Sequence, residues 1–201
     1  MSSPYFDRAA ARYLERSGRF PWRLVRSAEW RALRDALRLS PGLDVLDLGC
    51  GAGYYSLRIR ATADVRIHGV DASPSMMSAY RAQGFEGTCC RAETFTGSRP
   101  FDRILAAGLF EFVDDPERTF ENLARLLRGG GRLVCLIPNP GLLGELYKAF
   151  HAIRSCPTRV WDLARYSRLA ERHGFALRDC ARASFLGSVL GFEAAEALRI
   201  S

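Results

Sequence analysis

The sequence predicts one α/β domain built on a seven-stranded, mostly parallel sheet with helices on both faces. The chain has 201 residues, of which 48% are hydrophobic and 25% charged, which is the size and composition of a single globular domain. Short apolar runs alternate with helical patterns from Asp44 onward, as in parallel strands joined by crossover helices. These runs are almost continuously hydrophobic, as expected for strands covered on both faces.

The first 40 residues precede this alternation, and we expect them to form a helical lid. Apolar residues at helical spacing predict one amphipathic helix, and aromatic residues predict a shorter helix before it. The residues concerned are Leu24, Ala28, Leu33 and Leu37 for the longer helix and Tyr5, Phe6 and Tyr13 for the shorter one.

Five apolar runs predict the parallel strands, and helices with recognisable ends connect them. Ser73 and Asp115 are each followed by proline, the arrangement of an N-cap and a first helical position. Gly84 is expected to end the first of these helices and the glycines at 129–131 the second. The predicted strands cover residues 45–48, 65–70, 87–90, 104–107 and 133–137.

Beyond the fifth predicted strand, the chain adds a helix over residues 142–153 that the sheet does not require. Asp162 predicts the N-cap of a further helix that ends at Gly174. Two strands follow, over 176–183 and 188–195, with a short connection typical of a hairpin. The last strand should therefore run antiparallel to the others.

Charge, histidine and cysteine content argue against nucleic-acid binding and against a metal site. The net charge is +7, but the basic residues are spread along the chain without the clustering of a nucleic-acid surface. The three histidines are scattered, and the six cysteines show no C-x-x-C pair, so we expect no metal site.

No segment is apolar enough to span a bilayer, since the longest uncharged stretch has 12 residues. The charged N-terminus lacks the apolar core of a signal peptide. We therefore expect a cytoplasmic protein.

A glycine-rich turn follows the first predicted strand, in the run VLDLGCGAGYY at residues 45–55. Glycines at alternate positions let the backbone bend sharply and approach a ligand, and the free N–H groups at the next helix start favour an anion. Tyr54 stands where a dinucleotide fingerprint requires glycine, and the Gly-Lys-Ser/Thr of a Walker loop is absent.

Two acidic residues follow the next strands. Asp71 ends the second predicted strand, where a carboxylate can accept two hydrogen bonds from a ribose diol. Its alternative role as a helix cap is disfavoured because Ser73 already serves there. Glu93 follows the third strand and is either a partner for an adenine amino group or a solvated loop acid.

Together, these segments resemble the class I S-adenosylmethionine-dependent methyltransferases. The resemblance runs from Asp44 to Phe192 in the family's motif order, through residues 45–53, 68–77, 101–113 and 126–138. It implies a Rossmann-like fold, S-adenosylmethionine as methyl donor, S-adenosylhomocysteine as product, and no metal. Two departures are Gly129, where a proline is common, and Phe112, where many relatives have histidine or tyrosine.

The resemblance also implies a cofactor site. Asp47 would hold the amino group of the methionine portion, the glycine turn would contact that portion, and Asp71 would hold the ribose hydroxyls. The domain would comprise the lid (1–40), a cofactor-binding half (41–138) and a substrate-side part (139–201). The implied cofactor residues are Asp47, Gly49, Cys50, Gly51, Ala52, Gly53, Asp71, Ala72, Met76, Ala92, Glu93, Thr94, Ala107 and Gly108.

We expect the acceptor near the helix over 142–153, where Tyr147 and His151 lie four residues apart and share one face. We hypothesise that this face covers the acceptor, with His151 as general base if one is used. The alternative is an amphipathic lid on which His151 is merely exposed. Candidate pocket walls, which could equally be core residues, are Tyr5, Tyr13, Phe20 and Trp22.

The apolar N-terminal segment and the extra helix favour a small, hydrophobic acceptor methylated at oxygen. The Asn/Asp-Pro-Pro-Tyr/Phe motif of amino-targeting DNA methyltransferases is absent after the fourth strand. Two alternatives remain: an enzyme that modifies RNA or protein, and a non-catalytic relative that only binds the cofactor.

Overall fold

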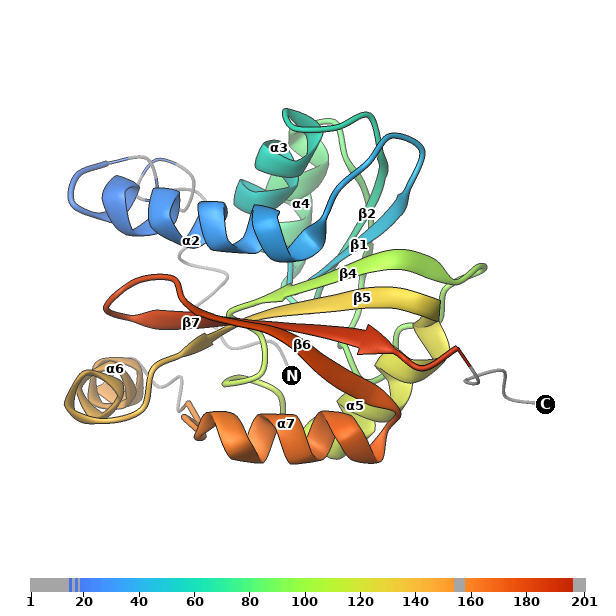
Figure 1. Ribbon diagram of the computed structural model, residues 1–201. Coiled ribbons are helices and arrows are strands. Elements are labelled where there is room, and N and C mark those ends of the chain that lie inside the picture. Colours follow the sequence, from blue (N-terminus) through green and yellow to red (C-terminus); the bar gives the residue numbers. More distant parts are fainter. Residues whose placement is uncertain (1–14, 16, 18, 154–157, 197–201) are drawn as a thin grey trace.

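The seven strands form one sheet in the order β3-β2-β1-β4-β5-β7-β6. The computed structural model describes residues 15, 17, 19–153 and 158–196 (Figure 1). Strand β7 is antiparallel to both its neighbours, β5 and β6, so the antiparallel last strand is confirmed. The strands are β1 (Asp44–Leu48), β2 (Arg66–Asp71), β3 (Glu86–Cys89), β4 (Phe101–Ala107), β5 (Leu127–Pro138), β6 (Phe175–Arg182) and β7 (Gly187–Ala194).

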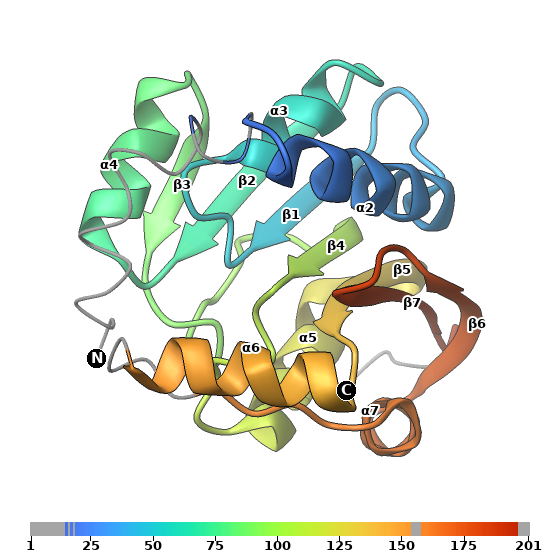
Figure 2. The same cartoon turned by 90° about the vertical axis from the view of Figure 1, so that its left-hand side faces the viewer.

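Helices cover both faces of the sheet, as predicted. Helices α2 (Trp22–Leu37), α3 (Tyr54–Arg60) and α4 (Pro74–Ala82) lie on one face, and α5 (Pro116–Leu126) and α7 (Leu163–Arg172) lie on the other (Figure 1). Helix α6 (Leu142–Ile153) stands beyond the end of β5, at the edge where the parallel strands terminate (Figure 2). None of the helices in the described part of the chain is long and apolar enough to cross a membrane.

Two large apolar clusters hold the layers together. On the α5 and α7 side, Phe120 is fully buried and stacks on Phe110 with ring centroids 4.7 Å apart. On the α2 side, Leu33 and Leu37 are fully buried against β1, β4 and β5. Burying a leucine or phenylalanine side chain contributes about 1.5–3 kcal/mol, so both faces of the sheet contribute to stability.

Helix α2 belongs to this packing, which corrects the expected lid for residues 22–37. Arg103 donates to the Leu37 carbonyl at 2.7 Å, and Arg132 donates to the Ala36 carbonyl at 2.8 Å. These bonds satisfy carbonyls that a helix C-terminus leaves without intrahelical partners. Leu24, predicted on the buried face, is 58% exposed. The shorter helix predicted around Tyr5 to Tyr13 lies outside the described residues.

The predicted helix starts are confirmed by their caps. Ser73, Asp115 and Asp162 each accept a hydrogen bond from the backbone N–H three residues on, at 3.2, 3.0 and 2.7 Å. One predicted end is wrong: α5 stops at Leu126, and the glycines at 129–131 lie within β5. Leu127 pairs with Phe101 of β4, so sheet pairing ends this helix before the glycines.

Removing the cap of α5 provides a stability test. The variant Asp115→Ala is expected to lower the free energy of unfolding by about 1 kcal/mol, because the Arg118 N–H loses its side-chain acceptor. Urea unfolding measures this change. Glu121→Ala, which removes an exposed ion pair with Arg125 on the same helix, should cost less than about 0.5 kcal/mol. Equal losses in the two variants would contradict the capping role.

Candidate active site at the carboxyl edge of the sheet

The glycine turn joins β1 to α3 where the parallel strands end. Gly49, Gly51 and Gly53 have φ angles of +78°, +53° and +92°, a left-handed region that side chains with a Cβ rarely adopt. The N–H groups of Gly49 and Cys50 both donate to the Val70 carbonyl, at 2.7 and 3.0 Å. The turn is therefore folded against the end of β2, and the predicted sharp bend is confirmed.

Asp71 braces this turn from the end of β2. Its Oδ2 accepts from the Gly51 N–H at 2.9 Å, and its Oδ1 accepts from the Ser73 N–H at 2.8 Å. The side chain thus links the glycine turn to the start of α4. Asp71 is half-buried at this edge.

Asp47 lies beneath the turn and is 2% exposed. Ser56 donates to its Oδ2 at 2.6 Å, and the Tyr80 hydroxyl lies 3.0 Å from Ser56 Oγ. The pKa of Asp47 is raised to about 7, mainly by burial and to a lesser extent by the nearby Asp71 charge, although the Ser56 hydrogen bond lowers it. No sequence pattern predicted this network, because Ser56 and Tyr80 reach Asp47 only through the packing of α3 and α4.

The other predicted cofactor residues of the turn and of α4 differ in how far they are buried. The Cys50 thiol packs on Met77, with its sulfur 3.8 Å from the methionine sulfur, and burial raises its pKa well above the usual range. Ala52 and Met76 are buried, whereas Ala72 is half-buried. Cys50 and Ala52 can thus meet a ligand through their backbone, while Ala72 offers its side chain.

The segment after β3 holds the predicted adenine neighbours. Glu93 accepts a hydrogen bond from Arg91 at 3.0 Å, and Arg91 also donates to Asp114 at 2.6 Å. Arg91 therefore ties the loop after β3 to the loop after β4. Ala92 is buried and Thr94 is exposed, and the Glu93 side chain, paired with Arg91, is 7% exposed.

The end of β4 brings a further acid to the site. Ala107 and Gly108 are half-buried, and Gly108 has a φ of +70°. Glu111 is 3% exposed, and its Oε1 lies 3.6 Å from the point that a Cβ on Gly108 would occupy. The sequence interpretation missed Glu111, although its place four residues after Ala107 put it at this edge.

Helix α6 reaches the same edge. The His151 ring packs edge-on against Phe112, with centroids 5.4 Å apart, and His151 is 7% exposed. The alternative of a merely exposed histidine is therefore wrong. Tyr147 belongs to helix α6, but its side chain is outside the described part of the structure.

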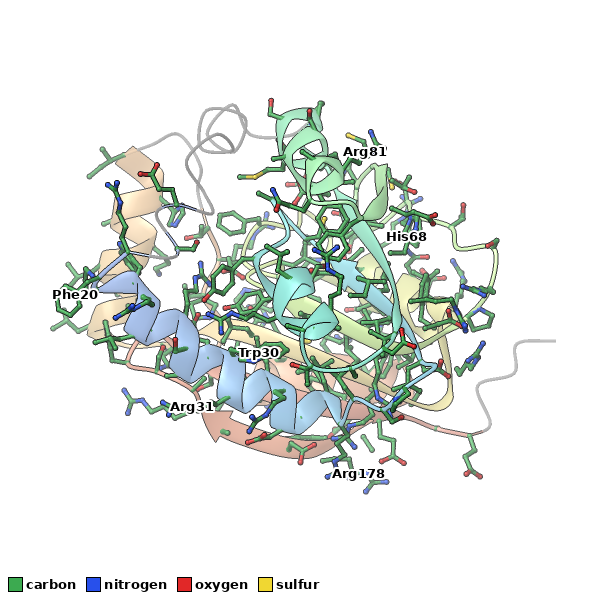
Figure 3. All side chains as sticks on the ribbon, turned by 90° about the horizontal axis from the view of Figure 1, so that it is seen from above. Phe20, Trp30, Arg31, His68, Arg81 and Arg178 are labelled. Atoms are coloured by element: carbon green, nitrogen blue, oxygen red, sulfur yellow. The ribbon has the colours of Figure 1, made fainter. Side chains whose placement is uncertain are left out.

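The predicted aromatic walls are only partly described. Phe20 and Trp22, at the start of α2, are 77% and 50% exposed, and Figure 3 labels Phe20 at the periphery of the molecule. Phe20 and Trp22 are therefore not core residues of the described structure. Tyr5 and Tyr13 lie outside the described residues.

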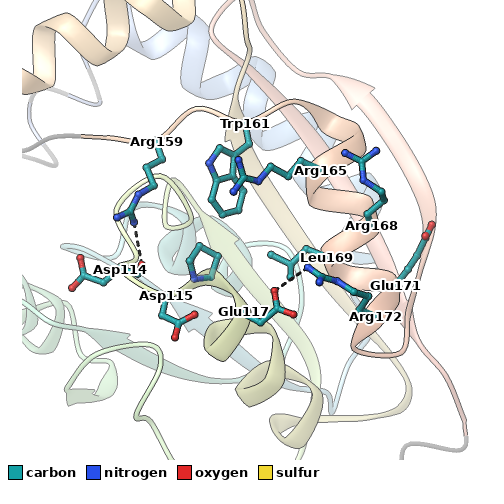
Figure 4. Close-up of a pocket in the computed structure, with 11 residues that line it drawn as sticks. Asp114, Asp115, Glu117, Arg159, Trp161, Arg165, Arg168, Leu169, Glu171 and Arg172 are labelled. Atoms are coloured by element: carbon teal, nitrogen blue, oxygen red, sulfur yellow. Dashed lines mark hydrogen bonds and ion pairs between the residues drawn. The ribbon is translucent and has the colours of Figure 1, made fainter.

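A separate groove lies between the loop after β4, the start of α5 and helix α7 (Figure 4). Two interactions occupy charged residues of this groove: Arg172 donates to Glu117 at 2.9 Å, and the Arg165 guanidinium lies 4.0 Å from the centre of the Trp161 ring. None of the predicted cofactor residues lines it. Across the described ranges, no group of three or more His, Cys, Asp or Glu residues could hold a metal ion.

Comparison with known proteins shows that the chain is similar to methyltransferases. Residues 46–135 match the family described as "Methyltransferase domain". The chain is 29% identical to phosphoethanolamine N-methyltransferase 1 of Triticum aestivum, over 70% of this chain and 30% of that protein. It is 27% identical to the ubiquinone biosynthesis O-methyltransferase of Coxiella burnetii, over 75% of this chain and 68% of that protein.

Among solved structures, magnesium protoporphyrin IX methyltransferase from Synechocystis PCC 6803, with bound SAH, shares the fold. The TM-score is 0.76 at 16% identity, over 95% of this chain and 96% of that one. The chain spans less than half the length of the first curated relatives that it matches. The matched segment, the strand order and the glycine turn agree with one another: the chain is similar to methyltransferases over residues 46–135 and shares their Rossmann-like fold.

Proposed function

We propose that this chain transfers the methyl group of S-adenosylmethionine to an oxygen atom of a small, hydrophobic acceptor. The observation that carries the proposal is the turn of three left-handed glycines, hydrogen-bonded to Asp71 at the carboxyl edge of the sheet. Open α/β sheets bind ligands at this edge. A backbone without Cβ atoms and a half-buried carboxylate together fit a group that combines an amino-acid tail with a ribose.

The cofactor would lie across the ends of β2, β1 and β4. Asp71 would accept the ribose hydroxyls, because it ends β2 beside the glycine turn, at the edge of the sheet where open α/β sheets bind ligands. Ala72, Met76, Ala92, Glu93 and Thr94 would border the adenine. The methionine portion would be held by Asp47, by the turn over residues 49–53, and by Ala107 and Gly108.

When bound, S-adenosylmethionine supplies a methyl group on a positively charged sulfur, which keeps the carbon–sulfur electron pair as the acceptor oxygen bonds to the carbon. The residues around the site must therefore align the acceptor with that bond and exclude water. Orientation alone can contribute ~7–11 kcal/mol. A carboxylate acceptor needs no base, whereas a phenol with a pKa near ~10 benefits from one.

His151 is the proposed base, at the buried face of α6 against Phe112. If the acceptor is a phenol, His151→Ala is expected to lower kcat about 100-fold near neutral pH, a typical contribution of general-base catalysis. The measurement is kcat between pH 6 and pH 9, with the SAH affinity as a control for folding. A kcat that is unchanged over this range would remove His151 from the mechanism.

The names of the relatives support a small acceptor: phosphoethanolamine, a ubiquinone precursor and magnesium protoporphyrin IX are small molecules. These names cover both nitrogen and oxygen acceptors, so methylation at oxygen rests on the apolar residues near the site. We further propose residues 41–138 as the cofactor-binding half and residues 139–201 as the substrate side. The cytoplasmic location stays a prediction.

Radiolabelled S-adenosylmethionine tests the proposed function. The purified protein is incubated with a lysate of a strain that lacks it, and the lysate is then separated into small-molecule and macromolecular fractions. The proposal expects label in an organic-soluble small molecule, in a methyl ester or a methyl ether. Label in RNA or protein would identify a macromolecular acceptor, and cofactor binding without label in either fraction would indicate a non-catalytic relative.

A further inference from the structure

Helix α6 carries an apolar stripe on its exposed side. Leu142 and Ile153, at its two ends, are 78% and 84% exposed. Gly144 and His151, on the opposite face, are buried. The exposed stripe follows the helical repeat and consists of Leu142, Leu146, Ala149 and Ile153. A helix of a globular protein usually turns its apolar face to the core, so this stripe indicates a surface that binds something else.

The tip of the β6–β7 hairpin places an exposed aromatic ring beside the start of α6. Phe185, in this tip, is 55% exposed. The Asn139 N–H donates to the Leu186 carbonyl at 2.8 Å, and the Asn139 side chain donates to the Ser184 carbonyl at 3.2 Å. Asn139 directly follows β5 and comes three residues before α6. The hairpin tip is therefore fixed at the end of β5, where α6 begins.

The start of α2 contributes further exposed apolar side chains on the same side of the molecule. Phe20, Trp22 and Leu24 are 77%, 50% and 58% exposed. The last turn of α2 accepts a hydrogen bond from Arg103 near the start of β4, so its first turn lies toward the end at which the parallel strands terminate. Figures 1 and 2 show the start of α2, the hairpin tip and α6 together on this side. We call the apolar rim the exposed side chains of these three segments: those of Phe20, Trp22 and Leu24, that of Phe185, and those of the α6 stripe.

Positive charge accompanies the apolar rim. Arg23 follows Trp22 on α2, and Arg182 ends β6 just before the hairpin tip. Both arginines are exposed, and neither side chain has an acidic partner among the described residues. Two other cations of these segments form exposed ion pairs: Arg19 with Glu15, and Lys148 with Glu145. The charge that remains uncompensated at the rim is therefore positive.

We propose that the apolar rim docks this protein on the surface of an anionic lipid bilayer. At such a surface, Leu, Phe and Trp side chains enter the boundary between head groups and acyl chains, and arginines attract the anionic head groups. The rim is made of projecting parts, namely a helix start, a hairpin tip and the side of a helix. A fluid lipid layer adapts to separate projections, whereas a folded protein partner would need a matching shape.

Docking through the rim would turn the carboxyl edge of the sheet toward the bilayer, because α6 and the hairpin tip stand at that edge (Figure 2). A hydrophobic acceptor would then pass from the acyl layer to the protein without crossing water. The inference uses only the rim and its charges. It therefore goes beyond the proposed function and can fail while that function holds.

Flotation with lipid vesicles tests the apolar part of the rim. The vesicles contain equal parts of phosphatidylcholine and phosphatidylglycerol. The double variant Leu142→Ser with Leu146→Ser is expected to bind them at least about 10-fold more weakly than the wild type, because it removes apolar surface from the stripe. The control is Leu177→Ser, at a 37% exposed position of β6 far from the hairpin tip, which should change binding less than about twofold. Thermal unfolding shows that the variants are folded.

The charge requirement is tested on the same vesicles and on vesicles of phosphatidylcholine alone. The double variant Arg23→Gln with Arg182→Gln is expected to bind the mixed vesicles about 10-fold more weakly or less, since each arginine near an anionic surface contributes severalfold in affinity. Arg31→Gln is the control, because Arg31 is exposed on α2 and Figure 3 labels it on the outer side. It should change binding less than about twofold, and the wild type should bind phosphatidylcholine alone more weakly than the mixture.

Trp22 reports whether the rim enters the lipid. Mixed vesicles with brominated acyl chains should quench part of the tryptophan fluorescence of the wild type, and Trp22→Phe should lose this quenching, because Trp30 is buried and Trp161 lies outside the rim. Three results would each overturn the inference: no binding to the mixed vesicles, equal losses in the rim and control variants, or quenching that persists in Trp22→Phe. A dimer in light scattering that binds no vesicles would overturn it as well, and would make the rim an interface between two copies.

Discussion

Asp71→Ala is expected to raise the Kd of S-adenosylhomocysteine at least about 100-fold. Two hydrogen bonds from ribose hydroxyls to a carboxylate are each worth about 1.5–3 kcal/mol, and every 1.4 kcal/mol is tenfold in affinity. The same substitution removes the acceptors of the Gly51 and Ser73 N–H groups. The glycine turn and the start of α4 would therefore lose their hydrogen bonds to Asp71 together with the ribose contact. Isothermal titration calorimetry measures the change directly.

Asp71→Asn separates the two roles of Asp71. The amide oxygen can still accept from one backbone N–H, but the amide nitrogen cannot accept from a ribose hydroxyl. We expect an intermediate loss of affinity, of about 10-fold or more, with little change in thermal stability. A Kd for Asp71→Ala within about threefold of the wild type would show that this carboxylate does not hold the ligand.

Asp47→Asn is expected to stabilise the protein at alkaline pH. The pKa of Asp47 is raised to about 7 from an ordinary value of 3.8. Below about pH 4 the group is protonated in both the folded and unfolded states, so its contribution to stability is the same at all lower pH values. Between pH 4 and pH 7 only the unfolded state ionises, so the free energy of unfolding falls as pH rises, by about 4 kcal/mol in all. Asparagine keeps an acceptor for Ser56 and has no charge to bury.

The measurement is urea unfolding of the wild type and Asp47→Asn at pH 4.5 and pH 8. The free energy of unfolding of the variant, relative to that of the wild type, should be several kcal/mol higher at pH 8 than at pH 4.5. If Asp47 holds the amino group, the variant should also bind S-adenosylmethionine less tightly. Asp44→Asn is the contrasting control. Its partner Arg66 lowers the pKa of Asp44, so Asp44 stabilises the fold above about pH 4 and that stability is lost on acidification. A pH-independent difference for Asp47→Asn would contradict a buried, protonated Asp47.

Local signals predicted the fold well, because each rests on interactions within a few residues. The caps at Ser73, Asp115 and Asp162 and the apolar runs of the strands required only the neighbouring sequence. The end of α5 was misplaced because the pairing of Leu127 with Phe101 joins residues 26 positions apart. Helix α2 was taken for a lid because its partners Arg103 and Arg132 come from β4 and β5, which no local pattern reveals.

The candidate site also combines features that the local sequence predicts with features that depend on residues distant in the sequence. The glycine turn and Asp71 could be predicted because a strand end, its glycines and its acid occupy fixed places in the chain. The Asp47–Ser56–Tyr80 network could not, because it depends on how α3 and α4 pack. The hydrogen bond from Arg26 to Tyr55 likewise joins residues 29 positions apart. Electrostatic features of the site thus needed the tertiary structure, whereas its backbone features did not.

Titration of the wild-type protein with S-adenosylhomocysteine in a calorimeter tests the central claim most directly. A glycine turn and carboxylate arranged for this ligand should give saturable heat with one site per chain, and a Kd in the micromolar range or below. The absence of saturable heat from a sample that unfolds cooperatively on heating would contradict the claim, because the protein would then be folded and yet unable to hold the ligand.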